Sequence, residues 1–257
     1  MIVEGKTLVV LPTLGDRLET LRLALQSVAD RRAESSLRLV VVVPTRATEA
    51  RAMVREFGGE IVDDPQRGKL AGAMNAGVAA RLDEEYYCGL GDDDLLRPGG
   101  IALLHSLMKR NPRNVVAYGG CDYIDDSGKT IGVSRAGQWA HRILAWGPDL
   151  VPHPGTLIKL DALEKVGGFD EARPFTMDLD AFLKLKRVGS FVSTKTSVSA
   201  FRWHRESMTV ANRKVSNREA RATKRQYLPR ALQPISPLWS YPVAWAISGV
   251  GRILSSR

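Results

Sequence analysis

Residues 86–99, YYCGLGDDDLLRPG, place a short apolar run directly before three consecutive aspartates, Asp92, Asp93 and Asp94. The run has the length and composition of a buried strand. Adjacent carboxylates repel one another, and a hard divalent cation such as Mg²⁺ or Mn²⁺ would relieve the repulsion. A solvated acidic turn is the alternative. A position at the end of a parallel strand favours the cation, because ligands of such sheets bind beyond the carboxyl ends of the strands.

The sequence before residue 86 alternates apolar runs with amphipathic stretches. It predicts strands at 7–11, 37–43, 60–62 and 86–90, and helices at 16–30, 47–57 and 69–82. This alternation is typical of βαβ units, and runs that are apolar throughout fit strands covered on both faces. We therefore predict an α/β fold with a mostly parallel central sheet and helices on both faces. After residue 100 the pattern loosens, with a turn predicted at 125–128.

The positive charge of the chain is concentrated near its C-terminal end. Residues 1–201 are balanced, whereas residues 202–257 hold 11 Lys and Arg against two acids and account for the whole net charge of +9. The apolar, Trp-rich segment 238–254 is too short and too interrupted to span a membrane, and fits a helix lying at a membrane surface. A helix packed on the core or a homodimer contact is the alternative. No nucleic-acid recognition motif is present, so nucleic acid is not an expected partner.

The two cysteines, Cys88 and Cys121, do not form a disulfide framework and read as buried free thiols. The first six residues contain no apolar segment typical of a signal peptide. Together with the basic tail, these features predict a cytoplasmic protein that lies peripherally on the inner face of the cytoplasmic membrane.

A second pair of carboxylates, Asp178 and Asp180, begins a predicted helix. Acidic residues are favoured at helix N-termini by the helix dipole, so capping is the simplest explanation from the residues alone.

Several short motifs, in their order and spacing, resemble glycosyltransferase family 2, whose members have the GT-A (Rossmann-like) fold. The segment Asp92–Gly99 resembles the family's Asp-x-Asp metal motif with its following Leu-x-Pro-Gly. The other matching segments are Pro12-Thr13, Arg67-Gly68-Lys69, Ala73–Gly77, His153–Thr156 and Gly167–Asp170. The resemblance extends from about residue 7 to residue 207. It implies an inverting enzyme that uses Mn²⁺ or Mg²⁺ to move a sugar from a nucleoside diphosphate to an acceptor hydroxyl.

The resemblance also implies roles for individual residues. Asp178 would be the catalytic general base, supported by Asp180 and Arg205. The metal would be held by Asp92, Asp94 and His204. The nucleotide sugar would be bound by Pro12, Thr13, Arg17, Asp63, Lys69, Asn75, Asp92 and Asp93, and the acceptor by His153, Gly155 and Thr156. A structural role for His204, and solvated positions for Arg17 and Lys69, are the alternatives.

The implied domain organisation is a catalytic domain at 1–206 and a basic C-terminal tail at 207–257 that associates with a membrane. Within the catalytic domain, residues 1–100 would bind the nucleotide and residues 101–206 the acceptor. The donor would be a UDP-, dTDP- or GDP-linked hexose or deoxyhexose. The acceptor would be a glycan or a lipid-linked glycan in the synthesis of a cell-envelope polysaccharide or glycolipid.

The chain departs from the family pattern at two places. Met177 stands where relatives usually carry Glu, so a carboxylate next to Asp178 is missing. Val42-Val43-Pro44-Thr45 stands where they usually carry Asp-Asp-Gly-Ser, whose first Asp contacts the base. Asp63 and Asp64, after the third predicted strand, are the candidates for a base contact in its place.

Two other functions fit parts of the sequence. A nucleotidyltransferase shares the nucleotide-binding α/β core, but needs a Gly-rich loop after the first strand, and residues 12–17, PTLGDR, contain a single glycine. A non-catalytic, membrane-bound scaffold with a degenerate transferase fold is the other candidate. The presence of Asp92, Asp94 and Asp178 argues against it.

Overall fold

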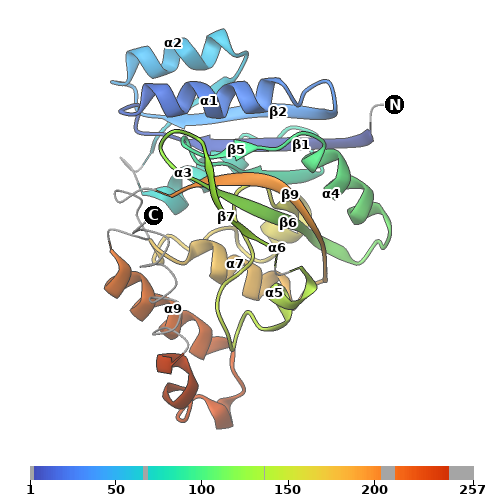
Figure 1. Ribbon diagram of the computed structural model, residues 1–257, viewed down its shortest axis with the longest axis vertical. Coiled ribbons are helices and arrows are strands. Elements are labelled where there is room, and N and C mark those ends of the chain that lie inside the picture. The colour runs from blue at the N-terminus through green and yellow to red at the C-terminus, as the bar shows by residue number, and fades with distance from the viewer. Residues whose placement is uncertain (1–2, 66–68, 136, 204–211, 243–257) are drawn as a thin grey trace.

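Figure 1 shows the computed structural model, in which residues 3–65, 69–135, 137–203 and 212–242 are described. Within these residues, one nine-stranded sheet has the order β3-β2-β1-β4-β8-β6-β9-β5, with β7 paired to β6. The strands are β1 (Val3–Pro12), β2 (Ser35–Val43), β3 (Glu60–Asp63), β4 (Tyr86–Gly89), β5 (Leu95–Leu96), β6 (Asn114–Ile124), β7 (Thr130–Ser134), β8 (Leu157–Lys159) and β9 (Ser190–Arg202). The helices are α1 (Leu18–Ala29), α2 (Thr48–Glu56), α3 (Leu70–Ala79), α4 (Gly100–Lys109), α5 (Gln138–Arg142), α6 (Leu160–Lys165), α7 (Met177–Leu185), α9 (Arg213–Tyr227) and the 3-10 helix η1 (Arg230–Leu232).

The first half of the sheet is parallel throughout. β1 pairs in parallel with β2 and β4, and β2 pairs in parallel with β3. A helix follows each of the first three strands, so the carboxyl ends of these four strands lie at one edge. The registers place Pro12 beside Val42, and Val43 beside Asp63, at that edge. The predicted α/β fold with its parallel sheet is confirmed.

Successive apolar residues of β1 point to opposite faces of the sheet, and both faces are covered. Leu8 and Val10 belong to a core shared with α3, α6 and α7, whereas Val9 and Leu11 belong to a core shared with α1, α2 and α4. Figure 1 shows α1 and α7 on opposite sides of the sheet. Burial on both faces explains why residues 8–11 of this strand are apolar without a break and do not alternate with polar residues.

The second half of the sheet is mixed. β8 lies antiparallel between β4 and β6, β9 pairs in parallel with β6, and β5 pairs antiparallel with β9. The pairing of Leu95 with Ala200 brings the end of β9 beside the segment that follows the three aspartates. Neither β5 nor the 13-residue strand β9 was predicted, because the sequence of β9, SFVSTKTSVSAFR, is rich in Ser and Thr and has no continuous apolar run.

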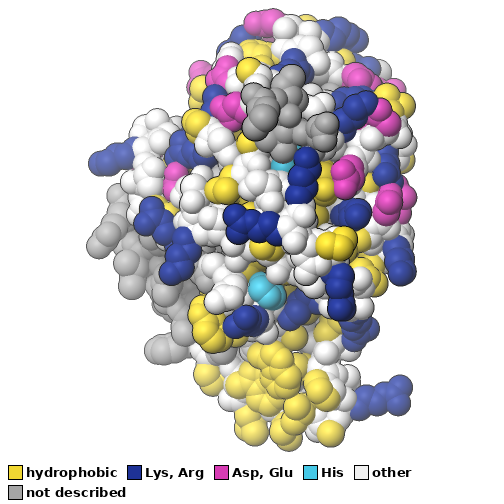
Figure 2. All heavy atoms as spheres, turned by 90° about the vertical axis from the view of Figure 1, so that its right-hand side faces the viewer, with side chains coloured by type: hydrophobic (Ala, Val, Ile, Leu, Met, Phe, Trp, Pro, Cys, Tyr) yellow, Lys and Arg dark blue, Asp and Glu magenta, His cyan; other side chains and the backbone are white. Residues whose placement is uncertain are grey.

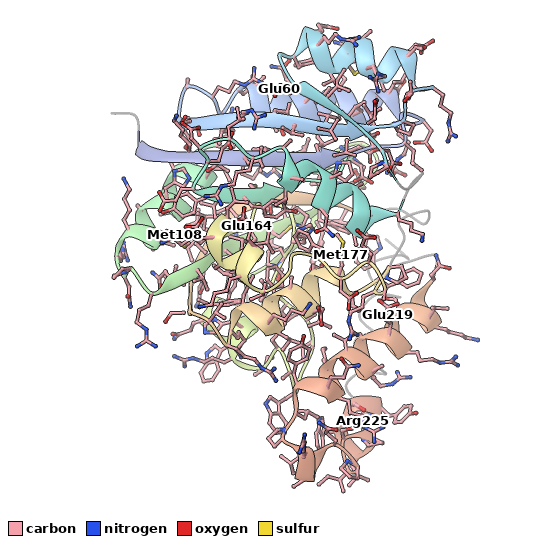
Figure 3. The ribbon with its side chains drawn as sticks, turned by 180° about the vertical axis from the view of Figure 1, so that it is seen from behind. Glu60, Met108, Glu164, Met177, Glu219 and Arg225 are labelled. Atoms are coloured by element: carbon pink, nitrogen blue, oxygen red, sulfur yellow. The ribbon has the colours of Figure 1, made fainter. Side chains whose placement is uncertain are left out.

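Helix α9, in the predicted tail, packs against α7. The Tyr227 hydroxyl donates to Asp180 Oδ1 at 2.6 Å, and Glu219 Oε1 accepts from the Thr176 hydroxyl at 2.8 Å and from the Phe175 backbone N–H at 2.9 Å. Figure 3 shows Glu219 near the beginning of α7. Residues 212–227 are therefore in contact with the predicted acceptor-binding half. None of the helices formed by the described residues is long and apolar enough to cross a membrane.

Candidate functional site

Asp92 lies just beyond the end of β4 and is buried. Its Oδ2 accepts a hydrogen bond of 2.7 Å from the hydroxyl of Thr13, which follows β1. The Thr13 backbone N–H in turn donates to the carbonyl of Val42 at the end of β2. The ends of three adjacent parallel strands thus position this carboxylate, as expected of a ligand-binding edge. Burial is the main cause that raises the pKa of Asp92, while Thr13 and Arg17 act in the opposite direction.

Arg17, in the loop before α1, bridges the first two aspartates. Its Nη2 lies 2.5 Å from Asp92 Oδ1 and its Nη1 lies 2.7 Å from Asp93 Oδ2. Charge-assisted hydrogen bonds of this kind are about twice as strong as neutral ones. Both oxygens of Asp92 therefore have partners in the protein, one in Thr13 and one in Arg17.

Asp94 is fully enclosed and depends on the last strand of the sheet. Its Oδ1 accepts a hydrogen bond of 3.1 Å from the backbone N–H of Arg202 at the end of β9. Burial, followed by the negative charge of Asp93, raises the pKa of Asp94 well above its usual range.

The buried side chain of Arg202 joins the aspartates to the turn between β6 and β7. Its Nε donates to the carbonyl of Asp93 at 3.1 Å, and its Nη1 donates to the carbonyls of Asp125 and Asp126 at 2.7 and 3.0 Å. Nη2 is buried and has no hydrogen-bond partner among the described residues. A guanidinium held in this way places a permanent positive charge behind the three carboxylates.

The arrangement around Gly91 fits a divalent cation. A Cβ at this position would lie 2.6 Å from Asp94 Oδ2 and 2.9 Å from Asp93 Oδ1, so the absence of a side chain leaves space on which two carboxylates converge. One or two carboxylates together with phosphate oxygens are the ligands that Mg²⁺ takes in nucleotide sites. In the described part of the chain, no group of three or more His, Cys, Asp or Glu side chains is arranged so that it could hold a metal ion by itself. His204 and Arg205, also predicted for this site, lie outside the described residues.

His153 lies against the end of β4. A Cβ on Gly89 would lie 2.7 Å from its Nε2, and that nitrogen is 3.0 Å from the hydroxyl of Tyr87. Gly155 donates its backbone N–H to the carbonyl of Gly89 at 3.1 Å, with a φ of +73° that favours glycine. The predicted acceptor segment, residues 153–156, is therefore held against Gly89, which precedes the first aspartate by three residues.

Asp178 is partly buried in the first turn of α7, where its Oδ1 accepts the Leu179 backbone N–H at 2.8 Å. Burial is the main influence on the pKa of Tyr87, Asp149 and His153: it raises the first two and lowers the third. The negative charge of Asp178 acts upward on all three, so Asp178 is electrostatically linked to Tyr87 and to its hydrogen-bond partner His153. Asp149 was not predicted, because nothing in its local sequence marks it as a neighbour of Asp178.

Asp149 is exposed, but desolvation by the protein atoms around it and then the charge of Asp178 raise its pKa to about 7, with Lys224 acting in the opposite direction. Lys224, on α9, is fixed by a hydrogen bond of 2.7 Å to the carbonyl of Gly147. An acid whose pKa is raised in the folded state destabilises the fold progressively as the pH rises from its unfolded-state pKa to the raised value, and the effect is constant above that value. We expect the melting temperature of Asp149→Asn minus that of the wild type to increase from pH 4 to pH 7 and then to level off. Differential scanning calorimetry measures both melting temperatures. For the control Asp161→Asn, an exposed residue of α6, the difference in melting temperature from the wild type should not change with pH.

Several other predicted residues have structural partners. Asn75 holds the backbone of Phe169 with both ends of its amide, at 2.8 and 2.9 Å. Thr156 is buried and donates to the carbonyl of Pro152. Asp180 is buried and pairs with Lys184 at 2.7 Å as well as with Tyr227. Their positions favour roles in holding the loops and helices of the site.

Three further predicted residues lie along the same edge. Pro12 ends β1, and Lys69 is exposed directly before α3. Asp63 ends β3 and is exposed, and its Oδ1 lies 2.6 Å from Arg51 Nη1, which lowers its pKa. Lys69, before a helix N-terminus, is suitably placed for a phosphate.

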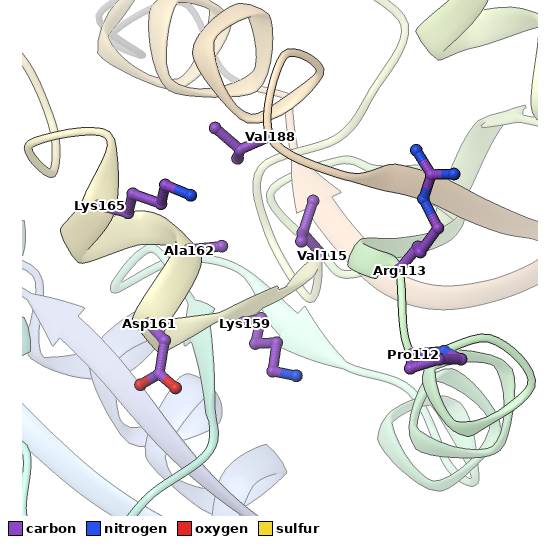
Figure 4. Close-up of a pocket in the computed structure, with 8 residues that line it drawn as sticks. All are labelled: Pro112, Arg113, Val115, Lys159, Asp161, Ala162, Lys165 and Val188. Carbon is purple, nitrogen blue, oxygen red and sulfur yellow. The ribbon is translucent and has the colours of Figure 1, made fainter.

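A shallow basic depression lies at the opposite edge of the sheet (Figure 4). It is lined by Pro112, Arg113, Val115, Lys159, Asp161, Ala162, Lys165 and Val188. Lys159 pairs with Tyr86, the first residue of β4, whereas the aspartates follow the last residue of that strand. The depression is therefore separate from the site.

Comparison with known proteins gives the same family that the motifs resemble. The sequence profile described as glycosyl transferase family 2 matches residues 8–163. An uncharacterized glycosyltransferase of Rickettsia bellii is 27% identical over 192 residues, which cover 71% of this chain, and one of Rickettsia felis is 26% identical over 159 residues, which cover 59%. The chain spans only about a quarter of the length of these relatives, 27% and 26% respectively.

Solved structures share the fold at low sequence identity. Residues 1–349 of TarS from S. aureus, in complex with UDP-GlcNAc, align with a TM-score of 0.65 and 13% identity, over 89% of this chain and 69% of that one. The mannosyltransferase PcManGT from Pyrobaculum calidifontis, in complex with GDP-Man and Mn²⁺, aligns with a TM-score of 0.64 and 15% identity, over 97% and 75% of the two chains.

Proposed function

Because this chain belongs to glycosyl transferase family 2, we propose that it transfers a sugar from a nucleoside diphosphate to an acceptor hydroxyl, with inversion at the anomeric carbon. The observation that carries the proposal is the end of β4. There the aspartates 92–94 follow the strand, and His153 lies against Gly89, the last residue of the strand. The negative charge of Asp178 acts on His153. A charged cluster for a diphosphate and a base for an acceptor would thus share one edge of the sheet.

In the proposed reaction, Asp178 takes the proton of the acceptor hydroxyl as that oxygen attacks the anomeric carbon. The bond from this carbon to the β-phosphate oxygen breaks, and its electron pair leaves with the nucleoside diphosphate. A single displacement inverts the configuration. A divalent ion held by the carboxylates of Asp93 and Asp94 would supply Lewis-acid stabilisation to the leaving diphosphate. His153 and Gly155 would shape the acceptor side.

We propose that donor binding depends on a divalent ion, because Asp93 and Asp94 converge beside Gly91 and Asp92 lies next to them. Solved neighbours hold UDP-GlcNAc or GDP-Man, so UDP-, GDP- and dTDP-sugars form the test panel. We expect one donor to raise the melting temperature only with Mn²⁺ or Mg²⁺, and to be slowly hydrolysed. Asp94→Ala should abolish this metal dependence. Metal-dependent stabilisation that survives in Asp94→Ala would refute the metal assignment, and a panel without any stabilising donor would refute the proposed reaction.

The acceptor is proposed to be lipid-linked, because an aromatic patch lies next to the acceptor side. We define the aromatic patch as Trp146, Ile235, Leu238, Trp239 and Tyr241, of which Leu238 is 76% exposed. The rings of Trp146 and Trp239 are 5.7 Å apart, and Arg221 lies 4.6 Å from the ring of Tyr241. Figure 2 shows the hydrophobic side chains gathered at the lower end of the molecule.

Exposed aromatic residues beside Arg and Lys fit the headgroup layer of an anionic membrane. Helix α9 supplies these charges, since its 15 residues include Lys and Arg throughout and Glu219 as its only acid. The patch is joined to the site through Lys224 and Gly147, two residues before Asp149. We therefore place the enzyme at the inner face of the cytoplasmic membrane, where it would meet a lipid-linked acceptor.

A further inference from the structure

We propose that Arg17 is a displaceable counter-ion: it holds Asp92 and Asp93 in the absence of donor, and releases them to a metal–diphosphate complex when the pyrophosphate binds its guanidinium. This inference rests on the proposed function, because it assumes a diphosphate ligand. It assigns a second task to a residue that the sequence predicts only as a nucleotide contact.

The two carboxylates occupy both arms of a single guanidinium, with Nη2 on Asp92 at 2.5 Å and Nη1 on Asp93 at 2.7 Å. Asp93 thus turns one oxygen to Arg17 and its other oxygen, Oδ1, toward the space beside Gly91. A cation that binds beside Gly91 without a diphosphate must therefore share Asp93 with a positive charge. Two like charges on one carboxylate disfavour each other, so Arg17 opposes the binding of free metal.

Exposure separates Arg17 from the other arginine of the cluster. The side chain of Arg17 is 38% exposed, whereas Arg202 is 2% exposed and donates to three backbone carbonyls. The guanidinium of Arg17 can reach solvent, whereas the carboxylates of Asp92 and Asp93 are 7% and 14% exposed and need a counter-ion. Arg17 can therefore leave when a cation takes its place as their counter-ion. The contacts of Arg202 are buried and would leave carbonyls without partners if broken. Arg202 is therefore the fixed charge of the cluster and Arg17 the exchangeable one.

A diphosphate offers Arg17 a better partner. Guanidinium groups bind phosphate oxygens in the same forked geometry in which they bind carboxylates, and a diphosphate brings more negative charge. Once the guanidinium has moved to the phosphate, Asp93 no longer shares its charge with Arg17 and is left, together with Asp94, for the cation beside Gly91. Arg17 should therefore weaken the binding of metal alone and strengthen the binding of diphosphate with metal. Such opposite effects couple the two ligands, and the coupling is reciprocal.

The test measures Mn²⁺ affinity by electron paramagnetic resonance of the free ion, and the affinities of UDP, GDP and dTDP at saturating Mn²⁺ by calorimetry. We expect Arg17→Gln to bind Mn²⁺ alone about fivefold more tightly than the wild type, because the positive charge that competes with the cation for Asp93 has been removed. With Mn²⁺ present, the nucleotide that the wild type binds should bind about tenfold more weakly to Arg17→Gln. Arg17→Lys, which keeps the charge but loses the fork, should fall between the two.

Arg22→Gln is the matched control, since Arg22 lies in α1, the helix that follows Arg17, and pairs with Glu56 on the surface, at 2.9 Å. It should leave both affinities unchanged. An unchanged or weaker affinity of Arg17→Gln for Mn²⁺ alone would overturn the proposal, and so would an unchanged diphosphate affinity. If the wild type binds none of UDP, GDP and dTDP, the proposed function loses its donor, while the Mn²⁺ measurement still decides whether Arg17 opposes metal.

Discussion

Replacing Asp178 with asparagine is expected to lower the rate of sugar transfer by about a thousandfold, or about 4 kcal/mol of activation free energy, because general-base catalysis contributes factors of this size. Asparagine has the same shape and keeps an oxygen for the Leu179 backbone N–H, so α7 should begin as before. It cannot take the acceptor's proton. Single-turnover transfer, measured with the donor identified by thermal stabilisation, gives the rate.

The binding of donor should be unchanged in Asp178→Asn, because the aspartates 92–94 and Arg17 are untouched. Asp161→Asn, an exposed carboxylate on α6 that pairs with Arg81, is the matched control and should keep full activity. Transfer within a few fold of the wild-type rate in Asp178→Asn would exclude this residue as the base. The product also separates the alternatives: a glycosyltransferase releases nucleoside diphosphate, whereas a nucleotidyltransferase releases pyrophosphate, and a scaffold releases neither.

Exchanging Leu238 and Tyr241 for serine should weaken binding to anionic vesicles by about a hundredfold, since insertion of each side chain is worth about 1.5 kcal/mol or more. Both side chains are exposed, 76% and 58%, so the variant should fold normally. Co-sedimentation with vesicles of phosphatidylglycerol and phosphatidylcholine measures the effect. Pure phosphatidylcholine should bind the wild type less well, because α9 then lacks an anionic partner.

The matched control for the vesicle experiment is Leu82→Ser, at a site that is 72% exposed and lies outside the aromatic patch. It should bind vesicles as the wild type does. If the double variant keeps its vesicle binding but changes from dimer to monomer in analytical ultracentrifugation, the aromatic patch is a contact between two copies of the chain. That outcome would end the proposal of membrane docking.

The parallel half of the sheet could be predicted because each of its features is local. β1 and β2 are apolar on both faces, and the helices between strands are amphipathic, so every element carries its own signal. The mixed half carries weaker signals. β5 has only two residues and exists because β9 passes beside it, a pairing between positions about a hundred residues apart. Propensity within a short window contains no information about such a partner.

The candidate site likewise contains some features that local sequence predicts and others that depend on contacts between distant residues. The position of the three aspartates after a strand, and of Thr13 and Arg17 on the same edge, follows from the order of the parallel strands. The contacts of Arg202, and the closeness of Asp149 to Asp178, arise from the tertiary fold. Asn75 and Thr156 show the converse case, in which a motif residue is in place but its polar atoms bind the backbone of its own chain. Motif matching identifies the residue without specifying which partner it holds.

The dependence of Asp94 on Arg202 has a consequence for biosynthesis. The two residues are 108 positions apart, and the backbone N–H that binds the carboxylate belongs to the final strand of the sheet. A nascent chain leaving the ribosome carries its three aspartates long before β9 has been synthesised. Until then they have no buried guanidinium behind them, so the cluster is complete only after residue 202 has been synthesised. A chain cut short before residue 202 would lack both the backbone N–H that binds Asp94 and the buried positive charge beside the aspartates.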